Sequence, residues 1–114
     1  MLNWSYMLAS WEIKFRPEAE SIRRMAKEFA EKEIAPIADR IDRENKYPMD
    51  LFEKMAKQGL FGMFTPTEYG GTGLDLLSSA IAAEEIAKVS MSASGIIGIQ
   101  AAVTAAPIAK FGSE

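Results

Sequence analysis

Apolar side chains recur every three or four positions through the first third of the chain, which is the spacing of one helix face. Pro17 begins this segment, and Glu18 and Glu20 follow it where the helix dipole favours acidic residues. Pro36 interrupts the segment, but the apolar stripe keeps its phase beyond it, so we predict one helix bent at Pro36. The stripe consists of Ile22, Met25, Ala26, Phe29, Ile34, Ile37, Ala38 and Ile41.

A second, shorter helix is predicted after the linker 44–48. Asp50 and Glu53 resemble a capping box at its start, and Gly59 is suited to end it in the left-handed conformation. The stretch 65–73 then contains three glycines and predicts a tight turn. Glycine-rich loops also bind phosphate, but no Lys-Ser or Lys-Thr pair follows this one, which favours a structural turn.

A third helix is predicted from a cap at Asp75 to Val89. Its predicted buried positions are Leu77, Ala80, Ile81 and Ile86. Glu84 and Glu85 are neighbours in sequence and therefore point about 100° apart on a helix. They do not form a facing acid/base pair, and we expect one to be exposed and the other to form a salt bridge.

The stretch Val89–Ala109 carries no charged residue, although charge is frequent before it. A membrane-spanning helix needs about 20 predominantly apolar residues, whereas this stretch is built largely from Ala, Ser and Gly. We therefore predict a buried core helix that starts near Ser92 or Ser94, and no membrane span.

This last helix is predicted to have three faces. A seam of small residues would let another helix approach closely: Ser94, Gly98, Ala102 and Ala106. A bulkier stripe would face the core: Ile96, Ile99 and Val103. Gln100, Ala101 and Thr104 form a third face, either satisfied inside a bundle or lining a ligand pocket.

Four predicted helices without a clear strand indicate an all-α, up-and-down helical bundle of four or more helices. The 114 residues fit one domain, and the absence of Cys and His excludes thiolate chemistry and the commonest zinc ligand. The net charge of −3 provides no basic surface for nucleic acid. Met1–Trp11 lacks the features of a signal peptide, so we expect a cytoplasmic protein.

Six short segments, in order and in register, resemble the N-terminal helical domain of the acyl-CoA dehydrogenases. The segments are Phe29–Pro36, Asp42 with Tyr47 and Pro48, Gly59–Gly62, Glu68–Leu74, Glu84–Ala87 and Phe111–Glu114. The resemblance covers residues 16–114 and leaves residues 1–15 as an aromatic-rich N-terminal arm outside the match. It implies an FAD-dependent enzyme that removes two hydrogens from the α and β carbons of an acyl-CoA thioester.

The resemblance also implies an electron-transfer acceptor and a homo-oligomer for the complete enzyme. It places Gln100, Ala101 and Thr104 in the wall of the acyl pocket. The family's middle β domain, its catalytic Glu and most FAD contacts lie beyond the position of Glu114. No catalytic or metal-binding residue is therefore assigned, and we expect this chain alone neither to hold FAD nor to be active. The alternative is a non-catalytic helical module that associates with itself.

Overall fold

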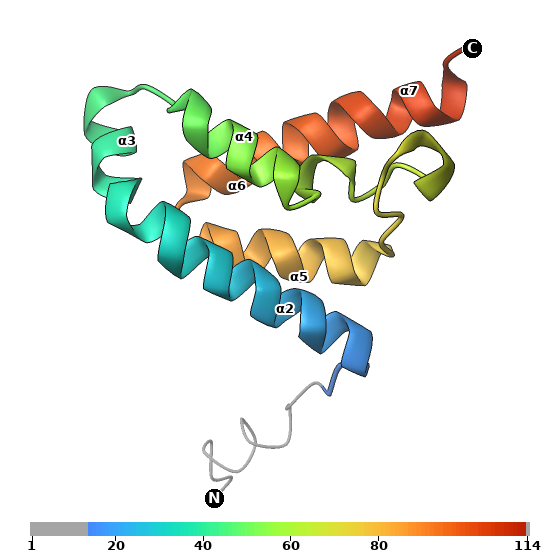
Figure 1. The fold of residues 1–114 in the computed structure, drawn as a ribbon, viewed down its shortest axis with the longest axis horizontal. Coiled ribbons are helices and arrows are strands. Elements are labelled where there is room, and N and C mark those ends of the chain that lie inside the picture. Colours follow the sequence, from blue (N-terminus) through green and yellow to red (C-terminus); the bar gives the residue numbers. More distant parts are fainter. Residues whose placement is uncertain (1–13, 114) are drawn as a thin grey trace, which may run out of the picture.

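Four helical rods run up and down in a computed structural model that describes residues 14–113 (Figure 1). Consecutive rods are antiparallel, and no strand occurs within these residues. This confirms the predicted all-α, up-and-down bundle. The α-helices are α2 (Pro17–Phe29), α3 (Ala38–Glu44), α4 (Met49–Lys57), α5 (Leu76–Ala87), α6 (Met91–Ile97) and α7 (Ala106–Phe111).

The first rod is one continuous, bent helix, as predicted. A π-helical turn, Ala30–Ile34, follows α2, and a 3₁₀ turn, Ala35–Ile37, leads into α3. Pro36 lies in the 3₁₀ turn, where its missing N–H is tolerated because the regular α-helical hydrogen bonds are already interrupted. Asn45, at φ 47°, ends the rod in the left-handed conformation.

The core lies where α2 packs along α5 and α5 packs along α6. Ile34 and Ile86 have no exposed surface, and neither does Met55 on α4. The remaining members of the core are Ala26, Phe29, Ala30, Ile41, Leu51, Leu60, Met63, Ala82, Ala93, Ile97 and Ala101. The buried stripe predicted for the first rod is confirmed at Ala26, Phe29, Ile34 and Ile41.

The predicted capping box at Asp50 is wrong. Helix α4 begins at Met49, so Pro48 occupies the N-cap position and no side chain caps the helix. The amides of Leu51 and Phe52 both donate to the Pro48 carbonyl, which starts the helix one residue before Asp50. Asp50 therefore lies inside the first turn, where it interacts with the helix dipole instead of capping it.

The predicted cap at Asp75 is confirmed. Its carboxylate accepts a hydrogen bond of 2.7 Å from the Ser78 amide at the start of α5. Arg16, just before α2, forms an ion pair with the same carboxylate. The Ser78 hydrogen bond, followed by Arg16, holds the pKa of Asp75 below its usual value.

Replacing Asp75 by alanine is expected to lower the thermal unfolding midpoint by several degrees near neutral pH, because the cap and the Arg16 ion pair are both lost. The pKa of Asp75 is lower in the folded than in the unfolded chain, so its contribution is present above the unfolded carboxyl pKa of about 4 and is lost as the pH falls below it. The wild-type and D75A midpoints, measured by circular dichroism, should therefore converge in acid. Asp50→Ala is the matched control and should have a smaller effect, and equal effects of the two substitutions would contradict the cap assignment.

The stretch 65–73 forms a tight structural turn, as predicted. Gly70 and Gly73 have φ values of 81° and 57°, and a Cβ on Gly71 would lie 2.0 Å from the Thr65 carbonyl oxygen. The N–H groups of Gly70, Gly71, Thr72 and Gly73 all donate to nearby backbone carbonyls. Because these amides are already hydrogen-bonded to backbone carbonyls, they are not free to bind a phosphate.

The predicted buried face of α5 is only partly correct. Ile81 and Ile86 are buried, but Leu77 is 44% exposed and Ala80 is also exposed. Ser78 and Ser79 are buried in their place, and the Ser79 hydroxyl donates to the Asp75 carbonyl at 2.9 Å. This local hydrogen bond satisfies the buried hydroxyl, which removes most of the penalty for placing it in the core.

The last rod differs most from its prediction. It begins at Met91 with a Ser90 cap, passes through a π-helical segment, Gly98–Ala105, and ends in α7. Its buried face consists of Ala93, Ile97 and Ala101. The predicted core stripe is wrong, since Ile99 is 57% and Val103 is 69% exposed.

The predicted small-residue seam is used only at its start. The Ser94 hydroxyl donates to the Ala83 carbonyl of α5 at 3.0 Å, whereas Gly98 and Ala102 are exposed. By length and composition alone, the helix Met91–Phe111 could cross a membrane, and only 17% of its most apolar part is buried. The prediction that the uncharged stretch Val89–Ala109 forms a buried core helix is therefore wrong for the described structure. The apolar composition of this stretch is weak evidence for a membrane, because core helices of soluble proteins share it.

Candidate functional site

An apolar groove lies between the last rod and the segment that connects α4 to α5. It encloses about 560 Å³, a size typical of small-molecule pockets. One wall comes from the π-helical segment and α7, and the other comes from the stretch 61–69. The lining residues are Phe61, Thr65, Tyr69, Gln100, Thr104, Ala105, Ile108, Ala109, Gly112 and Ser113.

The structure brings together two of the three predicted pocket residues. Gln100 and Thr104 both line the groove, at the level where the π-helical segment faces the connecting stretch. Ala101 does not line it, because Ala101 is 1% exposed and belongs to the core. Ala101 is therefore placed behind the groove wall, where it packs the helix onto the bundle.

The spacing of the groove residues along the last rod follows from its helix type. Gln100, Thr104, Ile108 and Gly112 recur every fourth position. In a regular α-helix such a row drifts by about 40° at each step, because 3.6 residues make one turn. The π-helical segment is wider and rotates less per residue, so it compensates for this drift and keeps the row on one side.

The groove offers apolar surface with a few neutral polar groups. Phe61 and Ile108 provide bulk, and the hydroxyls of Thr65, Tyr69 and Thr104 and the Gln100 amide provide polarity. None of its lining residues carries a charge. Such a lining suits a neutral, chain-like ligand and supplies neither a general base nor an anion-binding group.

The same chemistry tests whether the groove could hold a flavin dinucleotide. Its pyrophosphate requires cationic side chains or free backbone N–H groups. The residues lining the groove include no Lys or Arg, and the glycine-rich turn beside it uses its own N–H groups internally. The residues that line the groove therefore do not fit an entire FAD molecule.

Phe61, Tyr69 and Ile108 were not predicted as site residues. Phe61 and Tyr69 lie in two short 3₁₀ turns, Leu60–Gly62 and Thr67–Tyr69, which fold back toward the last rod. Both residues approach residues about 40 positions later in the chain, and local sequence patterns do not predict such tertiary contacts. The only local signal was the apolar run after Gly59, whose members could equally have been buried in the core.

The neighbouring carboxylates Glu84 and Glu85 lie outside the groove, and their environments differ as predicted. Glu85 is 6% exposed, with its carboxylate 2.7 Å from the Lys88 ammonium and 3.9 Å from the Arg23 guanidinium of α2. The hydrogen bond to Glu85 is the main reason that the pKa of Lys88 is raised. Glu84 is largely exposed. Glu85 therefore joins α2 to α5 through a partly buried ion pair with Arg23 and has a structural role.

Replacing Glu85 by glutamine is expected to lower the free energy of unfolding by about 2 kcal/mol, because the hydrogen bond from Lys88 loses the carboxylate charge and Arg23 loses its ionic partner across the helices. Glu84→Gln changes the same functional group one residue away and should have a clearly smaller effect. Urea denaturation of both variants provides the comparison. Equal losses would show that the buried position of Glu85 is unimportant.

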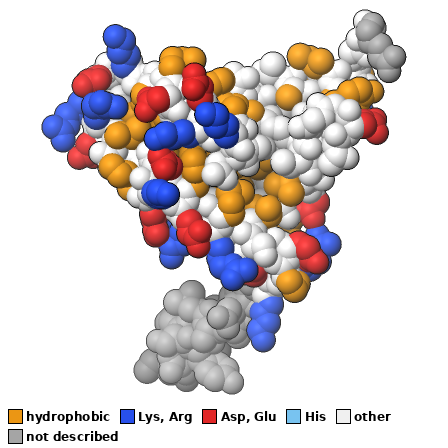
Figure 2. All heavy atoms as spheres, in the orientation of Figure 1, with side chains coloured by type: hydrophobic (Ala, Val, Ile, Leu, Met, Phe, Trp, Pro, Cys, Tyr) orange, Lys and Arg blue, Asp and Glu red, His pale blue; other side chains and the backbone are white. Residues whose placement is uncertain are grey.

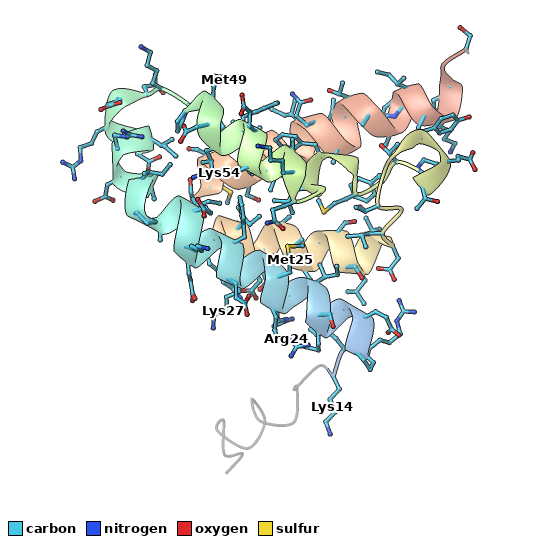
Figure 3. All side chains as sticks on the ribbon, viewed as in Figure 1. Lys14, Arg24, Met25, Lys27, Met49 and Lys54 are labelled. Atoms are coloured by element: carbon cyan, nitrogen blue, oxygen red, sulfur yellow. The ribbon has the colours of Figure 1, made fainter. Side chains whose placement is uncertain are left out.

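A second, polar hollow lies between α2 and α4, with a volume of about 430 Å³. The Lys54 ammonium of α4 donates to Glu33 at 2.6 Å across it, and Figure 3 shows Lys54 directed toward the first rod. This hydrogen bond lowers the pKa of Glu33 and raises the pKa of Lys54. Within residues 14–113, no group of three or more His, Cys, Asp or Glu residues is placed to hold a metal ion.

The surface has a charged part and an uncharged part, which correspond to the polar hollow and the apolar groove. Figure 2 shows Lys, Arg, Asp and Glu side chains gathered over the end of the molecule formed by α3 and α4. The surface over the C-terminal part of the last rod carries few charges on this face. The apolar groove thus opens in the uncharged part of the molecule.

This fold agrees with the family comparison. The sequence profile described as acyl-CoA dehydrogenase, N-terminal domain, matches residues 16–114. The chain therefore belongs to the acyl-CoA dehydrogenase family, and the resemblance seen in its sequence is confirmed. The predicted arm, residues 1–15, lies mostly outside the described residues.

Individual relatives support the same assignment. The chain is 41% identical over 97 residues to a probable acyl-CoA dehydrogenase, YngJ, of Bacillus subtilis, which covers 85% of this chain and 26% of the relative. It is 37% identical over 112 residues to the mitochondrial short-chain specific acyl-CoA dehydrogenase of Mus musculus, covering 97% and 27%. The structure of butyryl-CoA dehydrogenase from Megasphaera elsdenii is similar with a TM-score of 0.81 and 27% identity, covering 90% of this chain and 27% of that one. The chain thus spans about a quarter of the length of these relatives.

Proposed function

We propose that this chain is the N-terminal domain of a flavin-dependent acyl-CoA dehydrogenase and that it forms one wall of the acyl pocket. The match of residues 16–114 to the family's N-terminal domain carries this proposal. The uncharged groove adds a chemical reason, because a saturated acyl chain is neutral and apolar. In the complete enzyme, the substrate would be an acyl-CoA thioester oxidised between its α and β carbons.

Gln100 and Thr104 would contact the acyl chain, while Ala101 would support the wall from the core. FAD would accept the hydride in the complete enzyme, and an electron-transfer acceptor would reoxidise it. Since the described groove residues offer neither a base nor a pyrophosphate site, this domain would position the substrate and exclude water. We expect the isolated chain to have no dehydrogenase activity.

The exposed apolar face of the last rod fits the same proposal. Val103 is 69% and Phe111 is 77% exposed, which is unusual for large side chains so close together on one helix. In the complete enzyme, the other domains would cover this face. The cytoplasmic location and the homo-oligomer remain part of this proposal.

A domain exchange tests the proposed function. Residues 16–114 would replace the matching region of the Bacillus subtilis relative, and acyl-CoA-dependent reduction of an artificial electron acceptor would be measured. We expect a chimera that holds flavin and oxidises acyl-CoA. A folded, flavin-loaded chimera without acyl-CoA oxidation would contradict the proposal, as would oxidation by the 114-residue chain alone.

The second candidate function is a non-catalytic module that associates with itself through the exposed apolar face of the last rod. Ile99, Val103 and Phe111 favour it, because their exposed surfaces could pair with those of a second copy. Sedimentation velocity tests self-association and does not test the acyl pocket. A monomer at micromolar concentration would reject self-association and leave the acyl-pocket proposal unchanged.

A further inference from the structure

The largest apolar side chain in the groove wall opposite the last rod is Phe61, and its position is tightly determined. Phe61 lies in the 3₁₀ turn Leu60–Gly62, between two almost fully buried residues, Leu60 and Met63. These neighbours anchor the backbone on both sides of Phe61. The left-handed Gly59, at φ 76°, fixes the direction in which the turn leaves α4.

The Phe61 ring is also held from the side. It packs against the ring of Phe52 on α4, with a centroid separation of 4.5 Å and an angle of 43° between the planes. Aromatic pairs at this separation are attractive beyond the area they bury. Phe61 is therefore a fixed part of the groove wall, unlike an exposed side chain that a ligand could displace.

Several of the residues that line the groove on the last rod are small. Ala105, Ala109 and Gly112 line it on the last rod and occupy little volume. On the opposite wall, the fixed Phe61 ring and Tyr69 occupy part of the space that these small residues leave. A ligand that fills the groove contacts Phe61, because Phe61 is part of its lining.

We propose that Phe61 is a specificity-determining residue that limits the length of the acyl chain this domain accepts. The inference rests on the proposed function, because it assumes that an acyl chain occupies the groove. Shortening Phe61 would open space for additional methylene groups. Each methylene that enters an apolar space contributes about 0.8 kcal/mol, which corresponds to about a fourfold gain in affinity.

The test uses the full 114-residue chain and isothermal titration calorimetry with butyryl-, hexanoyl-, octanoyl- and dodecanoyl-CoA. For Phe61→Ala, we expect the ratio of long-chain to short-chain affinity to rise by at least tenfold over the wild type. Phe61→Leu should change the ratio in the same direction by a smaller factor, and it retains enough volume to protect the fold. Circular dichroism would establish that each variant is helical at the temperature of the titration.

Phe64→Ala is the matched control. Phe64 lies three residues away and packs against the core, but it does not line the groove. The control should leave the chain-length ratio unchanged. If Phe61→Ala and Phe61→Leu both leave the ratio unchanged while the wild type binds acyl-CoA, the inference is wrong and the proposed function stands. If the wild type binds none of the four probes, the groove of this chain does not hold an acyl chain by itself and the inference is wrong, while the domain assignment stands or falls with the chimera.

Discussion

Replacing Ile86 by alanine is expected to lower the free energy of unfolding by about 2–5 kcal/mol, the range for large-to-small substitutions at fully buried positions. Ile86 has no exposed surface and belongs to the core between α5 and its neighbours. A domain of this size has a total stability of roughly 5–15 kcal/mol, so this loss would be a large part of it. Urea denaturation followed by circular dichroism measures the change.

Leu77→Ala is the matched control on the same helix. Leu77 is 44% exposed, and its truncation removes much less buried surface. We expect a loss well below that of Ile86→Ala. A loss as large as that of Ile86→Ala would show that α5 is rotated about its axis relative to the described structure, with the originally predicted face in the core.

The second large effect is expected at the groove. Thr104→Trp would place an indole in the space between the last rod and the connecting segment, and we expect the affinity for octanoyl-CoA to fall by at least tenfold. This follows because the ligand and the indole would compete for the same volume. Isothermal titration calorimetry of the full chain measures the affinity.

Ala102→Trp provides the control for this substitution. Ala102 is exposed on the same π-helical segment and does not line the groove. It introduces the same side chain into the same helix without filling the groove. Octanoyl-CoA affinity should therefore remain close to that of the wild type. Equal losses in both variants would indicate that helix distortion, not groove filling, weakens binding.

The features that sequence reasoning predicted correctly are those determined by short-range chemistry. The bend at Pro36, the left-handed Gly59 and the Asp75 cap each depend on residues within one or two helical turns. Asp50 was an exception, because Pro48 begins α4 one residue earlier than the capping pattern indicated. A capping pattern identifies a helix start only to within a residue or two when proline precedes it.

The faces of the last rod could not be predicted in the same way. Residues 89–109 contain no charge, so the contrast between polar and apolar positions that fixes a helix phase is weak. Ala93 and Ala101 are buried while Ala102 is exposed, and composition does not distinguish between them. The π-helical segment Gly98–Ala105 then changes the phase again.

Only one wall of the groove, the one on the last rod, could be predicted from the sequence. The helix pattern predicts Gln100 and Thr104 on one polar face, the family resemblance assigns that face to the acyl pocket, and the structure places both residues in the groove. Phe61 and Tyr69 reach the groove through the path of the segment between α4 and α5. That path depends on contacts between residues far apart in sequence, which no local pattern encodes.

The π-helical segment has an evolutionary consequence. A π-turn accommodates one more residue than an α-turn, so deletion of a single residue between Gly98 and Ala105 would restore a regular helix. Because the wide turn absorbs the additional residue, the helix after the deletion would keep nearly the same orientation relative to the buried Ala93 and Ile97. The loss of one codon here would thus exchange side chains only within the π-helical segment, while Ile108 and Ala109 kept their places in the groove and α6 stayed packed on the bundle.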